Sequence, residues 1–455
     1  MSTSPVIQMT IGDETLVFEG PQVRTAHLVV ESSPISDELP GSSIEFTIIS
    51  TDETFSMFNA DRVNLLAERL PILAYERVDG SLKWLGKFYL EDWSNLSEQE
   101  IQFQAIDLIG VMEEMAFEGI FWASPVTLDT ALRQVLVPAD IPYDLDPSIA
   151  SRTLKGWIAP GSYRSALKQM LFAARATVST FGSDKLTIRS VALPNKMPDV
   201  ILADASVADS RKPSLLPLVY SVELVSHDYK ESDAPETVFD GILGAGTHKI
   251  IFERPYYNIE IIGPGFVPDT LVSTEGDRIV TTSGDWIAVG GSFQFGPNSV
   301  TLTLSEEAEI LITGYPWQDR MKSFQFVEAD AASYGNKKML SIREATLVSE
   351  DAAQGVLDTL RDYYRQRYQQ EYEVLPSDVT PGAKVLVNTY YRKKLLTQVR
   401  RIEFDMAGGF LGRVLARGIV PQYVPPMEHP YLRPRTGVAV AGANLLRQNM
   451  FREYA

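Results

Sequence analysis

The sequence predicts a mainly β protein with α+β parts. Short runs in which polar and apolar residues alternate recur along the chain, and a period of two is typical of half-buried strands. Gly, Pro, Asn and Asp separate these runs, as expected for turns between strands. Spacings of three and four residues, which indicate helices, are confined to residues 127–175 and to a stretch after residue 349.

The first part of the chain, residues 1–112, is expected to be β structure. Val6–Ile11 is a strand candidate followed by a Gly-Asp turn, and Ser43–Ile48 and Ile101–Asp107 alternate polar with apolar residues. Asp79-Gly80 separates two further runs, and an Asp-Gly pair in that position is a strong hairpin signal. Several short strands with regular turns favour a closed barrel or a sandwich.

Residues 113–214 are expected to form a small α+β domain. Apolar residues at helical spacing follow Thr127, a candidate N-cap, and Pro138 marks the end of this helix. The stripe consists of Leu128, Ala131, Leu132 and Val135. A second helix is predicted after Gly161-Ser162, and Lys185–Val191 alternates as a strand does.

The middle of the chain, residues 236–345, is again β-rich and broken by Gly and Pro. The longest helix candidate follows at 346–371, with Ser349 as its cap. Arginines and tyrosines interleave at 361–368, a pattern that can bind nucleic acid by stacking but more often packs tyrosines inward. The acidic background favours packing.

Strands return at Lys384–Val387, Leu396–Phe404 and Phe410–Val420, with a glycine turn between the last two. The segment 421–455 then changes character, because five prolines between 421 and 434 predict an extended arm that ends in a short amphipathic piece. Such an arm either docks on a neighbouring molecule or frays, and the sequence leaves both open.

Composition excludes several function classes. Acidic residues (59) outnumber Lys plus Arg (41), a formal charge of −18 that repels nucleic acid or simply aids solubility. No apolar run is long enough to span a membrane, and no signal peptide is recognised, so assembly in a cytoplasm is expected. With no Cys and four scattered His, no metal, cofactor or catalytic residue is predicted. Adjacent carboxylates such as Glu113/Glu114 do not make a glycosidase pair.

The order of the pieces resembles the tail hub (baseplate hub) family of tailed phages, prophages and related contractile injection systems. The resemblance is carried by Gly86–Trp93 leading to Ile101–Gly110, and by Arg365–Tyr368, Pro381-Gly382, Val399–Asp405 and Gly408-Gly409-Phe410. It implies a virion structural protein, not an enzyme. The long middle β segment and the proline-rich tail depart from the family pattern.

The resemblance further implies a homotrimeric ring at the tail tip, with two barrel-like tube domains per chain. Six such domains adapt a sixfold tail tube to a threefold tip and leave a channel for DNA ejection, so DNA is only in transit. The implied partners are a distal tail or tail tube protein and a spike, fibre or tape-measure protein. The tube domains are expected at 1–112 and at 215–235 with 372–420, and the acidity suggests a channel that does not grip DNA.

Two surfaces are predicted to make contacts between subunits or with the next component. They are the end of the long helix and the proline-rich arm, and the candidate interface residues are Tyr364, Arg365, Arg367, Tyr368, Pro425, Pro426, Leu446 and Phe451. The alternatives are a tail-associated cell-wall-degrading enzyme, and a host carbohydrate- or receptor-binding tail module that binds through residues 236–325.

Overall fold

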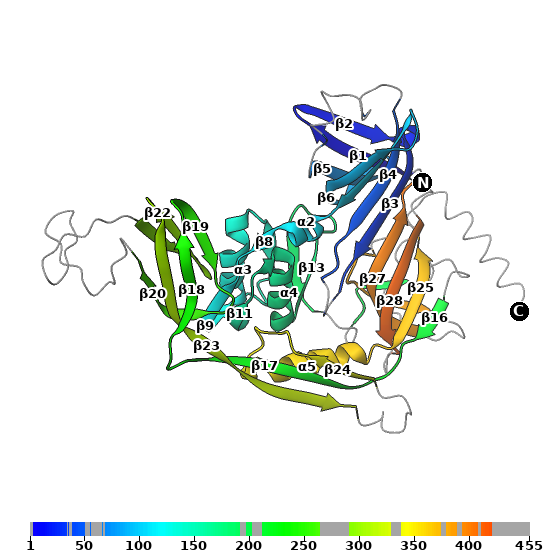
Figure 1. The fold of residues 1–455 in the computed structure, drawn as a ribbon. Coiled ribbons are helices and arrows are strands. Elements are labelled where there is room, and N and C mark those ends of the chain that lie inside the picture. Colours follow the sequence, from blue (N-terminus) through cyan, green and yellow to red (C-terminus); the bar gives the residue numbers. More distant parts are fainter. Residues whose placement is uncertain are drawn as a thin grey trace, which may run out of the picture.

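The computed structural model describes residues 3–33, 35, 39–50, 55, 66, 69–191, 197–202, 212–263, 291–328, 338–374, 379–388, 394–407 and 411–420. Most of these residues lie in strands, and the predicted mainly β class with α+β parts is confirmed. Two arms rise from a common base, with a helical part between them (Figure 1).

The N-terminal segment forms part of one large sheet. Its strands lie in the order β3-β4-β7-β6-β5-β1-β2, and we call them the first β unit. They are β1 (Thr3–Ile11), β2 (Glu14–Glu19), β3 (Val23–Glu31), β4 (Ser43–Ile49), β5 (Pro71–Val78), β6 (Ser81–Asn95) and β7 (Glu100–Ile106). The predicted hairpin is confirmed, since Val78 pairs with Ser81 and both Asp79 and Gly80 have positive φ.

Strands from the C-terminal part continue the same sheet and form the second β unit. Beyond β3 the sheet continues with β27 (Lys394–Asp405), β28 (Leu411–Ile419), β25 (Tyr368–Val374) and, at its edge, β16 (Lys212–Leu215). β26 (Lys384–Asn388) pairs with β27 and with β15 (Val200–Leu202). The assignment of residues 215–235 to this unit is wrong for β17 (Val219–Glu231), which lies in another sheet. Alternation identifies a strand but does not identify its partner.

The two β units meet at a single antiparallel pair of strands, which we call the seam. Residues Arg401 to Asp405 of β27 pair in register with Glu31 to His27 of β3. Just beyond this pair, the Ser32 amide donates to the Arg400 carbonyl at 2.7 Å. The seam therefore joins strands from the two ends of the described chain into one sheet.

One hydrophobic core spans both β units. Leu28 and Val30 of β3 and Ile402 of β27 belong to it and are at most 1% exposed. Fully burying a Val, Leu or Ile side chain contributes about 1.5–3 kcal/mol. Residues that alternate with these point to the opposite, more polar face of the sheet. The two units therefore share their stability across the seam.

The α+β part follows the first β unit. It contains α2 (Leu108–Glu114), α3 (Leu128–Leu136) and α4 (Tyr163–Ala174), with strands β8 (Ala116–Phe117), β9 (Ile120–Thr127), β10 (Tyr143–Leu145), β11 (Thr153–Ile158), β12 (Gly161–Ser162), β13 (Ala176–Ser179) and β14 (Leu186–Ser190). The predicted Thr127 cap is confirmed, because the Thr127 side chain accepts from the amide of Thr130. Ser162 caps α4 in the same way, by accepting from the amide of Ser165. The predicted apolar stripe of α3 is buried.

A base supports the helical part. It consists of β17, the long β23 (Ala308–Val327), β24 (Lys338–Ile342) and α5 (Glu350–Tyr364). β17 pairs with the second part of β23. The first part of β23 continues beyond the base, where it pairs with β18 (Glu236–Leu243) and β20 (Tyr256–Ile262).

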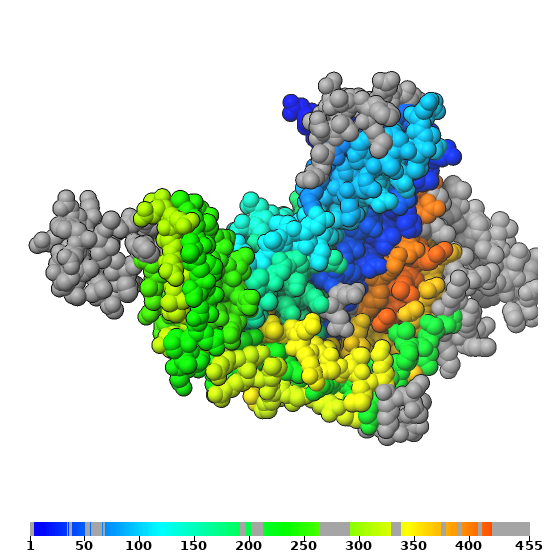
Figure 2. All heavy atoms as spheres, viewed as in Figure 1, coloured from blue at the N-terminus to red at the C-terminus, as the bar shows by residue number. Residues whose placement is uncertain are grey.

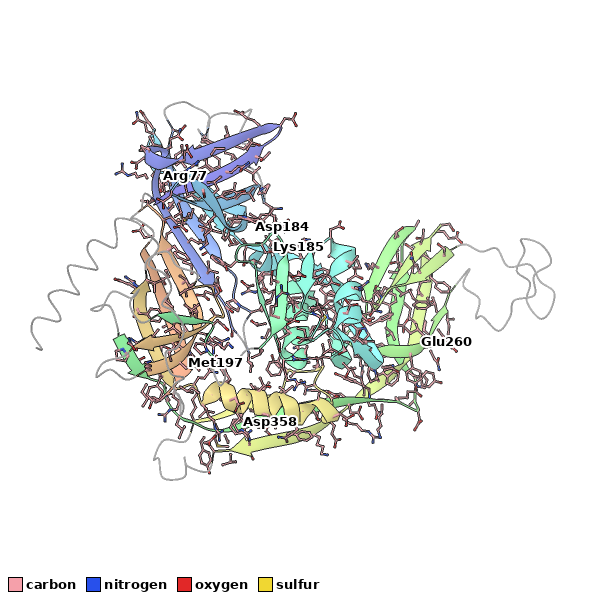
Figure 3. The ribbon with its side chains drawn as sticks, turned by 180° about the vertical axis from the view of Figure 1, so that it is seen from behind. Arg77, Asp184, Lys185, Met197, Glu260 and Asp358 are labelled. Carbon is pink, nitrogen blue, oxygen red and sulfur yellow. The ribbon has the colours of Figure 1, made fainter. Side chains whose placement is uncertain are left out.

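These two strands and a three-stranded sheet form the second arm, which we call the wing. The sheet contains β19 (Gly246–Ile251), β22 (Ser299–Leu304) and β21 (Gly291–Phe295). The space-filling view shows the wing and the first β unit as separate projections (Figure 2). From behind, Glu260 of the wing and Arg77 of the first β unit lie at opposite ends of the molecule, with Asp358 of α5 on the base (Figure 3).

The helix expected at 346–371 is shorter in the structure. α5 begins after Ser349, as predicted, and buries Ala353, Val356, Leu357 and Leu360. It ends at Tyr364, because residues 368–374 form β25 in register with β28. Tyrosines 364 and 368, which extended the predicted pattern, therefore lie in a helix end and in a strand.

Replacing Ile402 with Ala tests the seam. Ile402 is fully buried opposite Val30, and loss of its methyl groups with the cavity left behind costs about 2–5 kcal/mol. We expect a lower unfolding temperature and faster amide hydrogen exchange in both β3 and β27. Val29→Ala, on the other face of the same pair, should cost less than about 1 kcal/mol. Faster exchange in β27 alone would contradict a shared seam.

Candidate interfaces

The predicted interface residues Tyr364, Arg365 and Arg367 lie where α5 passes into β25. Arg365 donates to Glu328 twice, at 2.8 Å from Nη2 to Oε1 and at 3.1 Å from Nε to Oε2. Arg367 donates from Nε to the Leu216 carbonyl at 3.1 Å. Tyr364 is half-buried against the core. These three side chains therefore make contacts within the chain that hold the junction between the helix and the strand.

Tyr368, the fourth predicted residue of this group, lies at an apolar edge. On the same face of β25, Gln370 and Tyr372 are buried, whereas Tyr368 is 43% exposed. Its cross-strand partner Leu215 is 58% exposed, and Val420, just after β28, is 51% exposed. We call Leu215, Tyr368 and Val420 the edge patch. It extends the core-facing side of the second β unit to the edge strand β16, where apolar exposure is typical of a contact surface.

The other four predicted residues, Pro425, Pro426, Leu446 and Phe451, lie outside the described residues. Nothing in the fold tests their predicted contacts.

A buried arginine holds α5 against the second β unit. The Arg400 guanidinium lies 5.0 Å from the centre of the Tyr363 ring and donates from Nη2 to Gln366 Oε1 at 3.1 Å. Burial lowers the pKa of Arg400 to about 10, with Tyr363 acting in the opposite direction. Within the described residues, its Nε and Nη1 have no hydrogen-bond partner. The helix position is thus specified by a polar contact that costs desolvation energy.

Ion pairs cross the seam on its polar face. Arg401 lies 3.1 Å from Glu31 of β3 and 2.7 Å from Glu403, which also lies 3.9 Å from Arg413 of β28. All four side chains are partly exposed, so each pair contributes about 0–1 kcal/mol. The pairing registers place six carboxylates on this face of β3, β4, β25, β27 and β28, and the cations Lys394, Arg401, Arg413 and Arg417 lie among them: the carboxylates are Glu31, Glu45, Glu371, Glu373, Glu403 and Asp405. Arg24 of β3 pairs with a further carboxylate, Glu100 of β7, at 2.6 Å. The face is polar with an acidic excess.

A buried histidine ties the base together. His227 of β17 is 4% exposed, and its Nδ1 lies 2.7 Å from Asp319 Oδ2 and its Nε2 2.8 Å from the Arg343 carbonyl. Both partners are acceptors, so the geometry satisfies the doubly protonated ring. Burial alone lowers the pKa of His227, but the hydrogen bond and charge of Asp319 and the Arg343 carbonyl raise it above its ordinary value. The backbone amide of His227 also donates to Val348, just before α5.

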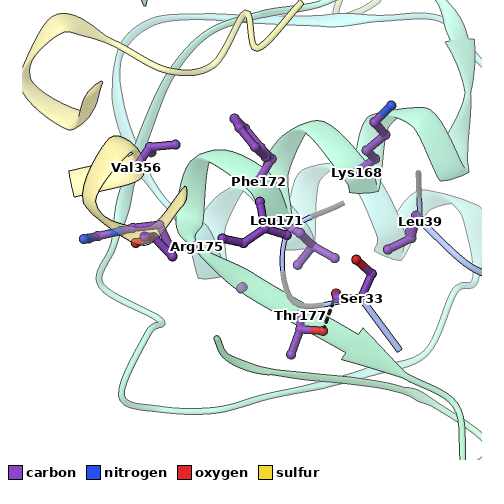
Figure 4. A pocket seen from close by; sticks show the side chains of 11 residues that line it. Ser33, Leu39, Lys168, Leu171, Phe172, Arg175, Thr177 and Val356 are labelled. Atoms are coloured by element: carbon purple, nitrogen blue, oxygen red, sulfur yellow. Dashed lines mark hydrogen bonds between the residues drawn. The ribbon is translucent and has the colours of Figure 1, made fainter. Parts of the chain in front are cut away.

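A small cavity lies between α4, α5 and the segment after β3 (Figure 4). Its volume is about 20 Å³, room for about one water molecule. Lys168, Phe172, Arg175 and Val356 are among its lining residues, and Thr177 donates to the Ser33 carbonyl at 2.9 Å. The size indicates a packing gap between elements.

In the part of the chain that the structure describes, no group of three or more His, Cys, Asp or Glu side chains is placed to hold a metal ion. Among the described helices, none is long and apolar enough to cross a membrane.

Several features of these surfaces were missed by the sequence analysis. Arg400 and Tyr363, Arg401 and Glu31, and His227 and Asp319 lie far apart in the chain. Each meets its partner only through strand pairing. A single sequence carries no signal for such pairs, because alternation does not define partners or register.

No family model and no curated protein matches the chain. Among solved structures it is similar to the 43 kDa tail protein of prophage MuSo2 from Shewanella oneidensis, with 10% identity, 90% of this chain and 98% of that chain covered, and a TM-score of 0.48. It is also similar to a tail protein from Neisseria meningitidis, with 10% identity, 91% of this chain and 96% of that chain covered, and a TM-score of 0.49. A prophage tail protein from Listeria monocytogenes has 9% identity, with 98% of each chain covered and a TM-score of 0.46. All three of these neighbours are described as tail proteins.

The His227–Asp319 pair makes stability depend on pH. A raised folded-state pKa means that the stabilisation is complete below the unfolded pKa of about 6.5 and is lost as pH rises through the folded value. We expect unfolding free energy to fall from pH 6 to 9 more steeply in the wild type than in Asp319→Asn, which should cost about 1.5–3 kcal/mol at pH 6. Asp228→Asn, whose carboxylate pairs with Lys155 instead, is the control and should keep the wild-type pH slope. If the unfolding free energies of the wild type and Asp319→Asn changed with pH in parallel, His227 would not be stabilised in its protonated form by Asp319.

Proposed function

We propose that this chain is a structural hub of a phage-type tail, and that three copies form a ring at the distal end of the tail tube. The ring adapts the sixfold tube to a threefold tip, spike or fibre and leaves a channel through which DNA passes during ejection. A distal tail or tail tube protein lies on one side of it, and a spike, fibre or tape-measure protein on the other. The sequence resemblance suggests this function, and the geometry of the large sheet supports it.

The observation that carries the proposal is the seam. It holds two β units of one chain side by side as a single sheet with a single core. Three copies of a chain with two such units place six similar units around the ring, which matches a sixfold tube. The rest of each chain occurs three times around the ring, which matches a threefold tip. A ring of six regularly spaced units requires that the two units of each chain are held rigidly together, because a flexible link between them would let their spacing in the ring vary.

Closure of the ring follows from the two different ends of the sheet. The strand path ends in β2 at one side and in β16 at the other, so a contact between these ends is head-to-tail, and head-to-tail contacts close into rings when the rotation permits. β16 is short and contains Pro213, which has no amide hydrogen to donate, and both features protect an edge against continued strand pairing. Side-chain contacts, with the edge patch at their centre, therefore hold neighbouring copies together.

The polar face of the sheet is the surface we assign to the channel. Its carboxylates outnumber its arginines, and the arginines at the seam already pair with carboxylates of the same face. Such a surface offers few cations to phosphate groups, so little counterion release favours DNA binding. DNA can then slide past without being held.

Within this proposal, residues 1–112, the strands β15 and β16 and residues 368–420 supply the tube, and residues 113–191 and 219–345 lie outside it. The helix region 346–367 braces the second β unit. The arm 421–455 contacts a neighbouring copy or the next tail component, through Pro425, Pro426, Leu446 and Phe451. The finished ring belongs to the virion, at the tail tip or baseplate, after assembly in the host cytoplasm.

A substitution that introduces a charge into the edge patch tests whether this patch forms the contact between subunits. We expect Tyr368→Glu to weaken trimer formation by a factor of about 30 or more, since a contact residue at the centre of an interface is worth about 2 kcal/mol or more. Sedimentation velocity should then show monomers at protein concentrations where the wild type is trimeric. Ile242→Glu, at a wing position that is 68% exposed, is the control and should leave the trimer intact. A trimeric Tyr368→Glu would exclude the edge patch from the interface.

Reversing charge on the polar face tests the channel. The double variant Glu45→Lys/Glu371→Lys should bind double-stranded DNA at low salt and lose it steeply as salt rises, whereas the wild type should show no binding by fluorescence anisotropy. Glu306→Lys/Glu307→Lys, which changes the same charge on exposed wing residues, should bind far less. Tight binding of DNA by the wild type would contradict the assignment of this face to a sliding channel.

A further inference from the structure

Five aromatic rings line a cleft between the wing and the α+β part. Its volume is about 350 Å³. β9 contributes one wall, and the start of β20 and the turn between β21 and β22 contribute the others. The aromatic rings belong to Phe121, Phe252, Tyr256, Tyr257 and Phe295.

Contacts behind the lining hold the aromatic walls in place. Trp317 of β23 lies 5.0 Å from the Phe121 ring and 5.4 Å from the Tyr257 ring, and the Tyr257 hydroxyl donates to the Ser232 carbonyl at 2.5 Å. On the other side, the side-chain amide of Asn298 donates from Nδ2 to the backbone carbonyl of Phe252 at 2.8 Å. The cleft is therefore preformed, as ligand sites usually are.

Two lining side chains point to a ligand. Asn258 lies at a β-bulge with φ of 48°, is exposed, and hydrogen-bonds through its side chain to none of the described residues. Phe295 leaves 47% of its surface to solvent at the mouth of the cleft. A positive φ is strained for most residues but tolerated by Asn, so this position presents an amide where glycine would serve the backbone equally well.

No charged residue is among the described lining residues. A phosphate or carboxylate ligand would find no cation there, and a nucleic acid would also meet the acidic charge of the whole chain, −18. A purely aliphatic ligand would make no hydrogen bond to the Asn258 amide. The chemistry therefore requires a neutral ligand that has both an apolar face and hydrogen-bonding groups at its rim.

We propose that this cleft binds a neutral saccharide of one or two sugar units. A pyranose ring has a face of C–H groups, which packs on aromatic rings, and a rim of hydroxyls, which pair with amides and phenol groups. The cleft volume lies in the range of about 300–1,000 Å³ that small-ligand sites occupy. The site lies in the wing, away from the sheet that forms the proposed ring. A test of sugar binding is therefore independent of a test of the hub function.

Saturation-transfer NMR on the full chain tests the proposal with glucose, galactose, N-acetylglucosamine, maltose, cellobiose and chitobiose as probes. We expect at least one of them to receive saturation on its ring C–H protons. Phe295→Ala and Asn258→Gly should each weaken that binding about tenfold, the effect of losing one well-placed contact. Asn258→Gly keeps the positive φ and removes only the amide. Ile251→Ala, at an exposed wing position that does not line the cleft, is the matched control and should bind as the wild type does.

Three results would overturn the proposal. The first is that no probe receives saturation, and the second is that binding persists in both cleft variants. The third is that a synthetic peptide of residues 421–436 binds in a Phe295-dependent manner while no sugar binds. Proline-rich segments also dock in aromatic grooves, so that last result would assign the cleft to the arm of another copy.

Discussion

The pairing of β27 with β3 is the constraint on which the rest of the structure depends. It joins the last described strands to the first ones, in one register and over one core. The chain leaves this sheet and returns to it twice, once for the α+β part between β7 and β15 and once for the base and the wing between β16 and β25, and the two ends of each long segment are fixed at the same sheet. Closing so long a segment is affordable because the entropy of loop closure grows only slowly with length, whereas the buried core residues each contribute kilocalories.

The base transmits this constraint to the wing. β23 pairs with β17 beside α5 and then continues into the wing, so one strand belongs to both. His227 links β17 and β23 with the segment before α5, and Arg400 links the end of α5 to β27 beside the seam. Both links are buried and polar. Such contacts add less stability than apolar packing but favour one arrangement over others, because any alternative leaves their polar groups without partners.

Local structure was predictable from the sequence, and its assembly was not. The Asp79-Gly80 hairpin, the Thr127 cap and the start of α5 after Ser349 follow from chemistry within a few residues. The partner of β17 and the end of α5 do not, because a strand's partner and a helix's end depend on residues elsewhere in the chain. The same holds for the surfaces: Tyr368 was predicted as a contact residue, yet its neighbour Leu215 and the aromatic cleft appear only after folding brings distant strands together.

Whether the chain assembles as a ring of three copies is tested by the mass of the purified full chain in light scattering, with negative-stain images of the same peak. We expect three chain masses and a ring with a central channel that shows six similar lobes on one side. A monomer at concentrations well above those of assembly, which remains a monomer when mixed with its tail tube protein, would exclude the ring.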